Sequence, residues 1–202
     1  MGVTLQTVTG ADLMPLLPAL ARLRIAVFRE FPYLYDGSQT EEESHLRAFA
    51  SSPSAGLVVA WDGGTAVGCA TAMKLTDASA TVAAPFRARG LDPADFFYFG
   101  ESVLLPAYRG EGIGVGFFAA REAHARAAST CGYATFCAVI RPHDHPYRPP
   151  GTVGLDAFWH KRGYTPYPDL VCTMRWTEIG GVTEVENRLS FWMKSLSGHA
   201  LP

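Results

Sequence analysis

The sequence predicts an α/β protein whose core is a mixed sheet flanked by helices, and three observations lead to this prediction. Strand and helix patterns alternate along the chain in the order β-α-α-β-β-β-α-β-α-β-β. Residues 56–75 read as a hairpin around a tight turn. An apolar strand at 96–105 runs through a glycine-rich turn into a helix. With 202 residues and 48% hydrophobic content, the chain is expected to form one domain, residues 1–202.

The N-terminal part is predicted to hold one strand and two helices. Residues 3–8 alternate weakly, as a strand does, and leucines and a valine recur at helical spacing within 15–29. Pro18 suggests that this helix starts slightly later than its pattern, because proline suits a first helical turn. Residues 39–50 read as a second helix with Thr40 as its N-cap.

The middle of the chain is predicted to form three strands. Asp62, Gly63 and Gly64 give a strong turn signal between the two strands of the hairpin. Residues 79–95 read as a loop with a short helical piece. Pro106 ends the third strand, because proline has no N–H to pair.

The C-terminal half is predicted to alternate between helices and strands. Its closing strand offers an edge for a homodimer. The expected elements are a helix at 112–128, a strand at 133–140, a proline-rich loop at 141–151, a helix at 155–163 and strands at 169–176 and 188–195.

Composition argues against several classes of partner. The net charge is −2 and no block of Lys and Arg occurs, so a nucleic-acid partner is not expected. No apolar stretch of about 20 residues occurs, so no membrane span is expected. The four cysteines follow no zinc spacing, and the N-terminus carries no secretion pattern. The expected location is therefore a reducing cytoplasm.

A cluster of glycines lies between the third strand of the middle part, at 96–105, and the helix that follows it. Glycine costs about 1 kcal/mol inside a helix relative to alanine, so Gly110, Gly112, Gly114 and Gly116 need a reason. Free N–H groups at a helix N-terminus form an anion site, and Arg109 adds a positive charge beside them. The turn is therefore expected to hold a pyrophosphate. The Lys-Ser/Thr ending of a P-loop is missing, and the spacing fits a dinucleotide fold poorly, which leaves coenzyme A.

The segment Arg109-Gly110-Glu111-Gly112-Ile113-Gly114 matches the R/Q-x-x-G-x-G/A signature of the GNAT acyl-CoA N-acyltransferase superfamily. The chain resembles this family also in its preceding strand and in the later segment AFWHKRGY. The resemblance implies a mostly antiparallel sheet splayed between its fourth and fifth strands, with acetyl-CoA as co-substrate and no metal. The residues it assigns to acetyl-CoA are Val103, Leu104, Leu105, Arg109, Gly110, Glu111, Gly112, Ile113, Gly114, Val115 and Trp159.

Glu101 is the candidate catalytic residue. A charged group inside an apolar strand is costly in free energy unless it forms an ion pair or contacts water. The pKa of the Glu101 carboxyl is therefore expected to rise towards that of a useful base. The resemblance implies a general base at this position, working through water, and an oxyanion donor from the backbone near Leu105. The alternative is a structural carboxylate that binds backbone N–H groups.

The general acid is not evident in the sequence. The family usually has tyrosine at the position of Trp159, and an indole N–H does not protonate a thiolate at neutral pH. Tyr164, Tyr147, His143 and water are the alternatives.

Two regions are expected to border the acceptor site. The loop 141–151 is read as a rigid border that recognises a polar or anionic substrate, with a purely structural loop as the alternative. A metal site at its two histidines is not favoured, because no further ligand is evident. The substrate-binding candidates are Arg141, His143 and His145 in this loop and, by resemblance, Phe28, Tyr33 and Tyr35 near the first helix.

The function expected from these features is acetyl (or short acyl) transfer from acetyl-CoA to a primary amine of a small molecule or peptide, by direct attack in a ternary complex. A non-catalytic acyl-CoA-binding module is the alternative. A nucleotide-binding oxidoreductase is a third and weaker hypothesis.

Overall fold

The computed structural model describes residues 2–202 and places seven strands in one sheet, in the order β1-β2-β3-β4-β5-β7-β6. All neighbouring strands are antiparallel except β4 and β5. The strands are β1 (Thr4–Thr9), β2 (Gly56–Asp62), β3 (Thr65–Lys74), β4 (Phe96–Leu104), β5 (Tyr133–Val139), β6 (Thr165–Thr177) and β7 (Glu184–Ser195). The helices are α1 (Leu17–Phe28), α2 (Gln39–Ala50), α3 (Ala80–Ala88), α4 (Ile113–Ala128) and α5 (Asp156–Lys161).

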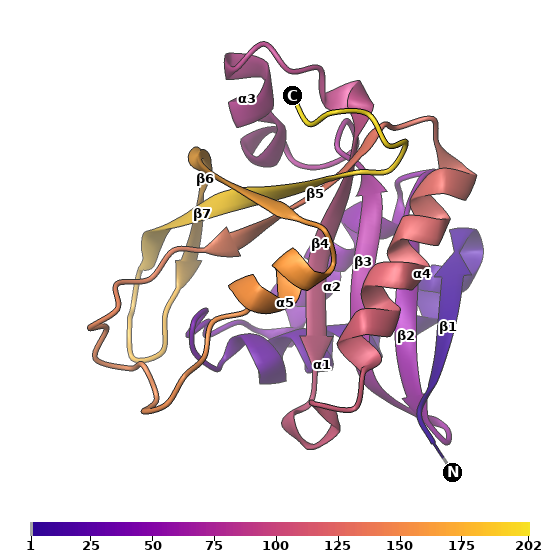
Figure 1. Cartoon of the computed structure of the whole chain (residues 1–202). Coiled ribbons are helices and arrows are strands. Elements are labelled where there is room, and N and C mark those ends of the chain that lie inside the picture. Colours follow the sequence, from indigo (N-terminus) through magenta and orange to yellow (C-terminus); the bar gives the residue numbers. More distant parts are fainter. Residues whose placement is uncertain (1) are drawn as a thin grey trace.

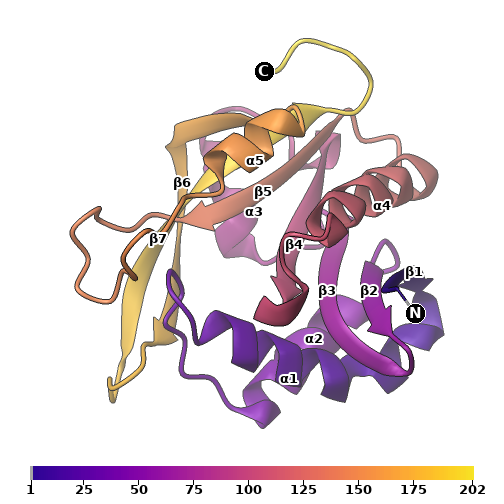
Figure 2. The ribbon, with the colours of Figure 1, turned by 60° about the horizontal axis from the view of Figure 1, so that its bottom comes forward.

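Helices cover both faces of the sheet. Figure 2 shows α1 and α2 on one side and α4 on the other. Alternation along β2 explains how one strand serves both layers. Leu57 and Val59 pack in the cluster that contains α1 and α2, whereas Val58 and Ala60 pack against α4. The mixed α/β sheet predicted from the sequence is confirmed.

The sheet opens between β4 and β5. These strands pair over three positions only, from Phe96 with Tyr133 to Tyr98 with Thr135. Beyond that point β4 stays paired with β3 and β5 stays paired with β7, so the two strands run apart, as Figure 1 shows. The splay expected between the fourth and fifth strands is confirmed.

A bulge in β4 follows directly after the last of these pairs. Phe99 lies opposite Ala72 and Ser102 opposite Ala70, so Gly100 and Glu101 share one partner position. A bulge of this kind reverses the alternation of side chains beyond it. Phe99 therefore packs on the α4 face, whereas Glu101 reaches Arg24 of α1 on the other face.

The bulge is fixed by a hydrogen bond to β3. The Glu101 N–H donates to Thr71 Oγ1 at 3.2 Å. A Cβ at position 100 would overlap the same oxygen, so the bulge needs Gly100.

Three sequence predictions need correction. The N-cap of α2 is Ser38 in a capping box with Glu41, two residues earlier than the predicted Thr40 cap. Residues 80–88 form a regular helix rather than a mostly irregular loop. The strand predicted at 188–195 is longer and lies between β5 and β6, so its backbone is paired on both sides and it is not an edge for a dimer.

Replacing Ser38 by Ala is expected to lower the free energy of unfolding by about 1 kcal/mol, because the Glu41 N–H in the first turn of α2 loses its acceptor, the Ser38 hydroxyl. Urea unfolding measures the loss. The matched control is Thr40→Ala, which is expected to change stability much less. Equal losses in both variants would contradict the assignment of the cap.

Candidate functional site

The turn before α4 presents free backbone amides. Gly110 and Gly112 have φ values of 87° and 83°, and a Cβ on either would meet no atom within 4 Å. Among residues 2–202 no protein acceptor receives the N–H groups of residues 110–114. The Val115 N–H, in contrast, donates to the Gly112 carbonyl at 3.0 Å, and a contact of Val115 with acetyl-CoA stays a prediction. The turn offers an anion an open row of donors at the positive end of the α4 dipole.

Arg109 lies beside this row of amides and is half exposed. Its Nε donates to the Leu104 carbonyl at 3.0 Å, and its Nη1 bonds Glu30 Oε2 at 2.9 Å. An exposed ion pair of this kind contributes about 0–1 kcal/mol to stability. The Arg109 guanidinium can therefore release Glu30 and bind a stronger anion with little loss of free energy. Of the remaining predicted turn residues, Glu111 is exposed and the Ile113 side chain is buried against β2 and β3.

The β4 edge that faces the splay differs from the prediction. The Leu105 N–H donates to the Val67 carbonyl at 3.0 Å and is not free. The backbone groups of Val103, two residues earlier, also point to β3, because backbone groups alternate along a strand and the partner of Val103 is Cys69 of β3. The groups that point into the opening therefore belong to Ser102 and Leu104. The sequence could not show which residues of β4 direct their backbone groups into the opening, because it did not reveal the bulge.

A buried cluster of charge surrounds Glu101. The Arg24 guanidinium bonds Glu42 through Nε and Glu101 Oε1 through Nη1, the latter at 2.7 Å. The side chains of Arg24 and Glu101 are each 10% exposed. Arg24 comes from α1, Glu42 from α2 and Glu101 from β4, so the cluster ties three elements together. Two carboxylates and one guanidinium leave it a formal charge of −1.

Arg24 sets the ionisation of Glu101. Burial acts to raise the pKa of Glu101, but the attraction of Arg24, with a smaller contribution from His45, outweighs it and lowers the pKa below its ordinary value. The expectation of a raised pKa is therefore wrong, because it ignored a buried cation from another element. Glu101 is a carboxylate at neutral pH.

Glu42 was not among the candidates from the sequence, although a signal for it was present. Glu42, Leu46 and Phe49 are the buried residues of α2, and they fall at positions i, i+4 and i+7. Arg24 likewise shares the buried stripe of α1. A charged residue on the apolar face of each of two helices predicts a buried ion pair.

The aromatic acceptor candidates lie beside this cluster. The Arg24 guanidinium sits 5.0 Å from the centre of the Phe28 ring, and Tyr33 packs on Phe28 with ring centroids 4.5 Å apart. Burial, followed by a hydrogen bond to Glu42, raises the pKa of Tyr35. These three aromatic residues and Glu101 are thus brought together.

The loop 141–151 supplies a structural contact rather than a free cation. Arg141 donates to the carbonyls of Pro32 and Tyr33 at 2.6 and 3.1 Å and lies 2.7 Å from Glu178 Oε1. Its guanidinium is therefore engaged by protein, and its contact with a substrate stays a prediction. His145 packs near Phe31, with ring centroids 5.7 Å apart, and His143 is exposed.

Trp159 is partly buried and packs against the core cluster that contains Phe136 and Trp192. Its ring lies 5.1 Å from the Phe136 centroid and 5.0 Å from that of Trp192. Gly114 of the α4 turn approaches the same region, where a Cβ would contact Phe158 at 3.4 Å. Among the described residues no group of three His, Cys, Asp or Glu side chains is placed to hold a metal, and no helix is long and apolar enough to cross a membrane.

Comparisons with known proteins agree with this geometry. Residues 20–147 match the model of the acetyltransferase (GNAT) family. No curated protein sequence matches the chain. The match covers well over half of the chain, which therefore belongs to the acetyltransferase (GNAT) family and is an acyltransferase.

Solved structures show the same fold at low sequence identity. YncA of Salmonella typhimurium, solved with its cofactor acetyl-CoA, is 14% identical with a TM-score of 0.57, covering 100% of this chain and 98% of that one. A ribosomal-protein-alanine N-acetyltransferase of Brucella melitensis is 14% identical with a TM-score of 0.61, covering 95% and 99%. An N-acetyltransferase of Staphylococcus aureus Mu50 is 12% identical with a TM-score of 0.59, covering 97% and 99%.

Replacing Arg24 by Met is expected to lower the free energy of unfolding at pH 7 by about 3–5 kcal/mol, because two buried carboxylates lose their cation. In the wild type Glu101 has a depressed folded-state pKa, so its stabilising contribution is present above the unfolded pKa and is lost as the pH falls through the folded pKa. In the variant Glu101 lacks the cation that lowers its pKa and protonates more readily, so the loss should shrink below about pH 4.5.

Urea unfolding at pH 7 and pH 4 measures this difference. Arg22→Met is the matched control, because Arg22 is exposed on the same helix. A loss for Arg24→Met that is the same at both pH values would contradict the assigned ion pairs.

Proposed function

We propose that the protein is an N-acetyltransferase that transfers an acetyl or short acyl group from acetyl-CoA to a primary amine of a small molecule or peptide, in a ternary complex. The observation that carries this proposal is the row of free amides at residues 110–114, which lies beside Arg109. Such a row fits a diphosphate, since each N–H can donate to a phosphate oxygen and the helix dipole adds to the attraction.

The residues of the splay fit the rest of acetyl-CoA. An extended arm with amide groups can pair with an open strand edge, and β4 offers the backbone of Ser102 and Leu104 there. To bind in this way, the arm would take the Leu104 carbonyl from Arg109, which now donates to it. The thioester supplies an activated acyl carbon.

Glu101 is proposed to receive the proton of the amine. A cationic amine first loses one proton to solvent. The neutral amine nitrogen then bonds to the acyl carbon, the C–S bond breaks and its electron pair leaves on sulfur, while a second proton of the amine passes to Glu101 directly or through water. Arg24 holds Oε1, which leaves Oε2 for this proton. Because its pKa is low, Glu101 is charged and ready to accept at neutral pH, although the driving force for transfer is smaller than that of a tuned base.

The acceptor class follows from the charge of the cluster around Arg24. Its formal charge of −1 attracts an ammonium group and repels an anion. The aromatic rings of Phe28 and Tyr33 lie next to it and can contact an apolar or cationic body. A cationic amine is therefore the proposed acceptor, in place of the anionic substrate considered from the sequence of loop 141–151.

Gly112→Ala is expected to weaken CoA binding about tenfold or more, because a side chain at this positive-φ position strains the turn and stands among the free amides. Calorimetric titration with CoA measures the change. Gly90→Ala is the matched control, since Gly90 also has a positive φ of 74° and open space around a Cβ but lies far along the chain from the turn. Equal affinities of the Gly112 variant and the wild type would refute the diphosphate site.

Glu101→Gln is expected to lower kcat about 100-fold while leaving the dissociation constant for CoA within about twofold, because a proton acceptor is lost and the diphosphate site is untouched. Thiol release from acetyl-CoA is followed with a panel of primary amines, cationic and neutral. Turnover that is unchanged in the variant would remove Glu101 from the mechanism. Thiol release that no amine accelerates in the wild type would count against the proposed reaction.

A further inference from the structure

Arg121 of α4 is a buried cation without a counter-ion. Its relative exposure is 2%, and among residues 2–202 no carboxylate forms an ion pair with it. Its Nε donates to the Phe117 carbonyl at 3.3 Å and its Nη1 to the Glu101 carbonyl at 3.4 Å. Lys and Arg are almost never fully buried unless paired, so this residue needs an explanation.

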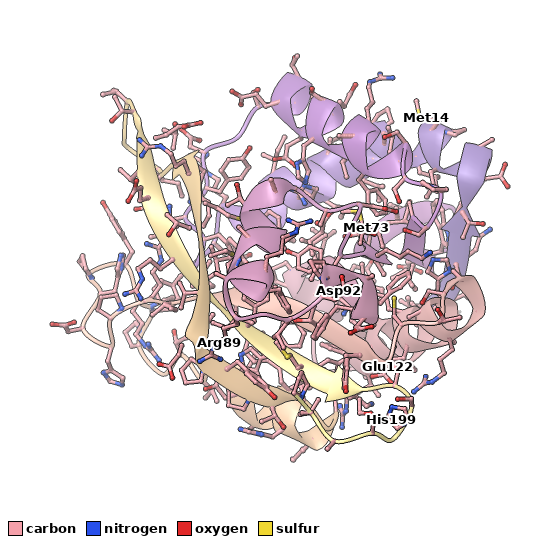
Figure 3. The ribbon with its side chains drawn as sticks, turned by 90° about the horizontal axis from the view of Figure 1, so that it is seen from above. Met14, Met73, Arg89, Asp92, Glu122 and His199 are labelled. Atoms are coloured by element: carbon pink, nitrogen blue, oxygen red, sulfur yellow. The ribbon has the colours of Figure 1, made fainter. Side chains whose placement is uncertain are left out.

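The nearest carboxylate on the same helix is already neutralised. Glu122, labelled in Figure 3, receives hydrogen bonds from Lys194 Nζ at 2.8 and 2.9 Å and from the Tyr164 hydroxyl at 3.2 Å. Glu101 directs its carboxylate towards Arg24 on the other face of the sheet and offers Arg121 only its carbonyl. Neither carboxylate therefore balances the charge of Arg121 directly.

Two aromatic rings hold the guanidinium in place. Its carbon lies 4.6 Å from the centre of the Phe99 ring and 4.7 Å from that of Phe118. Burial lowers the pKa of Arg121 to about 10, against the weaker opposing effects of Tyr164, Glu101, Glu122 and Cys69. Arg121 therefore carries its charge at neutral pH.

The guanidinium lies at the closed end of the splay. Phe99 is the first residue of β4 beyond the last pair with β5, and Glu101 follows it in the bulge. Arg109, in contrast, binds Leu104 at the open end, three residues or ~10 Å further along the strand. Cations thus mark both ends of the free β4 edge: one beside the diphosphate turn and one where an arm lying along this edge would end.

We propose that Arg121 stabilises the negative charge that develops on the leaving sulfur of the acyl donor, the task for which no tyrosine is present at position 159. This inference rests on the proposed function. The C–S electron pair goes to sulfur, and Arg121 gives up no proton but provides a fixed positive charge in a site of low polarity. The proton that later converts the thiolate to a thiol comes from solvent. Arg121 and the carboxylate of Glu101 then act from opposite faces of β4 on the two charges of one reaction.

The test compares the binding of CoA and of desulfo-CoA, which lacks the sulfur, between pH 7 and pH 9.5 by calorimetry. In the wild type CoA is expected to gain about tenfold in affinity over desulfo-CoA as its thiol ionises, because a nearby cation lowers the pKa of a thiol by a unit or more. Arg121→Met should lose this gain while binding desulfo-CoA within about twofold of the wild type. Arg121→Lys, which keeps the charge, should retain part of it.

The matched control is Arg126→Met, because Arg126 lies on the same helix with a half-exposed side chain. A wild-type affinity ratio that does not change with pH would overturn the proposal, whether or not any variant folds. So would an Arg121→Met variant that folds and weakens both ligands equally, as a purely structural arginine would. Absence of binding of both ligands to the wild type would instead refute the proposed function on which the inference rests.

Discussion

The end of pairing between β4 and β5 is the constraint on which the site depends. Each strand is held on its other side, β4 by β3 and β5 by β7, so the two edges diverge with the halves of the sheet to which they belong. Backbone groups left unpaired inside a protein are costly, and they must find water, side chains or a ligand. The splay is therefore a polar opening between two apolar strands, and its own chemistry favours an extended ligand with amide groups.

Aromatic packing keeps this opening from closing. The rings of Phe118, Phe136 and Tyr164 meet beneath the splay, with centroids between 5.1 and 5.7 Å apart. Phe99 joins them at 6.3 Å from Phe118. These packed rings prevent the edges of β4 and β5 from approaching each other, because side chains in a close-packed interior have little room to move. The same group of rings supplies the ring faces that stabilise the buried guanidinium of Arg121.

The sequence was sufficient to predict most of the fold and part of the site. Periodicity located the strands and long helices, and the run from Arg109 to Gly114 carried the family resemblance and located the glycine-rich turn before α4. The first part of β6 was missed because Pro166 and Pro168 argue against a strand, although proline is tolerated at the sheet edge that β6 forms. The α2 cap was placed at Thr40 because Ser38 and Thr40, two positions apart, both carry a residue type that caps helices.

The electrostatics of the site were less accessible, because they depend on contacts between distant segments. Arg24 and Glu101 are 77 positions apart, and their pairing reverses the expected direction of the Glu101 pKa. No local pattern reveals such a contact. The sequence also did not show which β4 residues direct their backbone groups into the splay. The bulge adds a residue to the strand, and apart from Gly100 the residues around it are typical of a strand.

The bulge also decides which arginine neutralises Glu101. In a regular strand of this sequence, alternation would place Glu101 on the face of Phe99, where Arg121 lies, and would leave Arg24 with Glu42 alone. With the bulge, Glu101 pairs with Arg24 and only its carbonyl reaches Arg121. The bulge thus separates a carboxylate and a guanidinium that a regular strand would bring to one face. It leaves a carboxylate on one face of β4 and, among the described residues, a guanidinium without a carboxylate partner on the other, and the proposed acyl transfer rests on this pair of opposite charges.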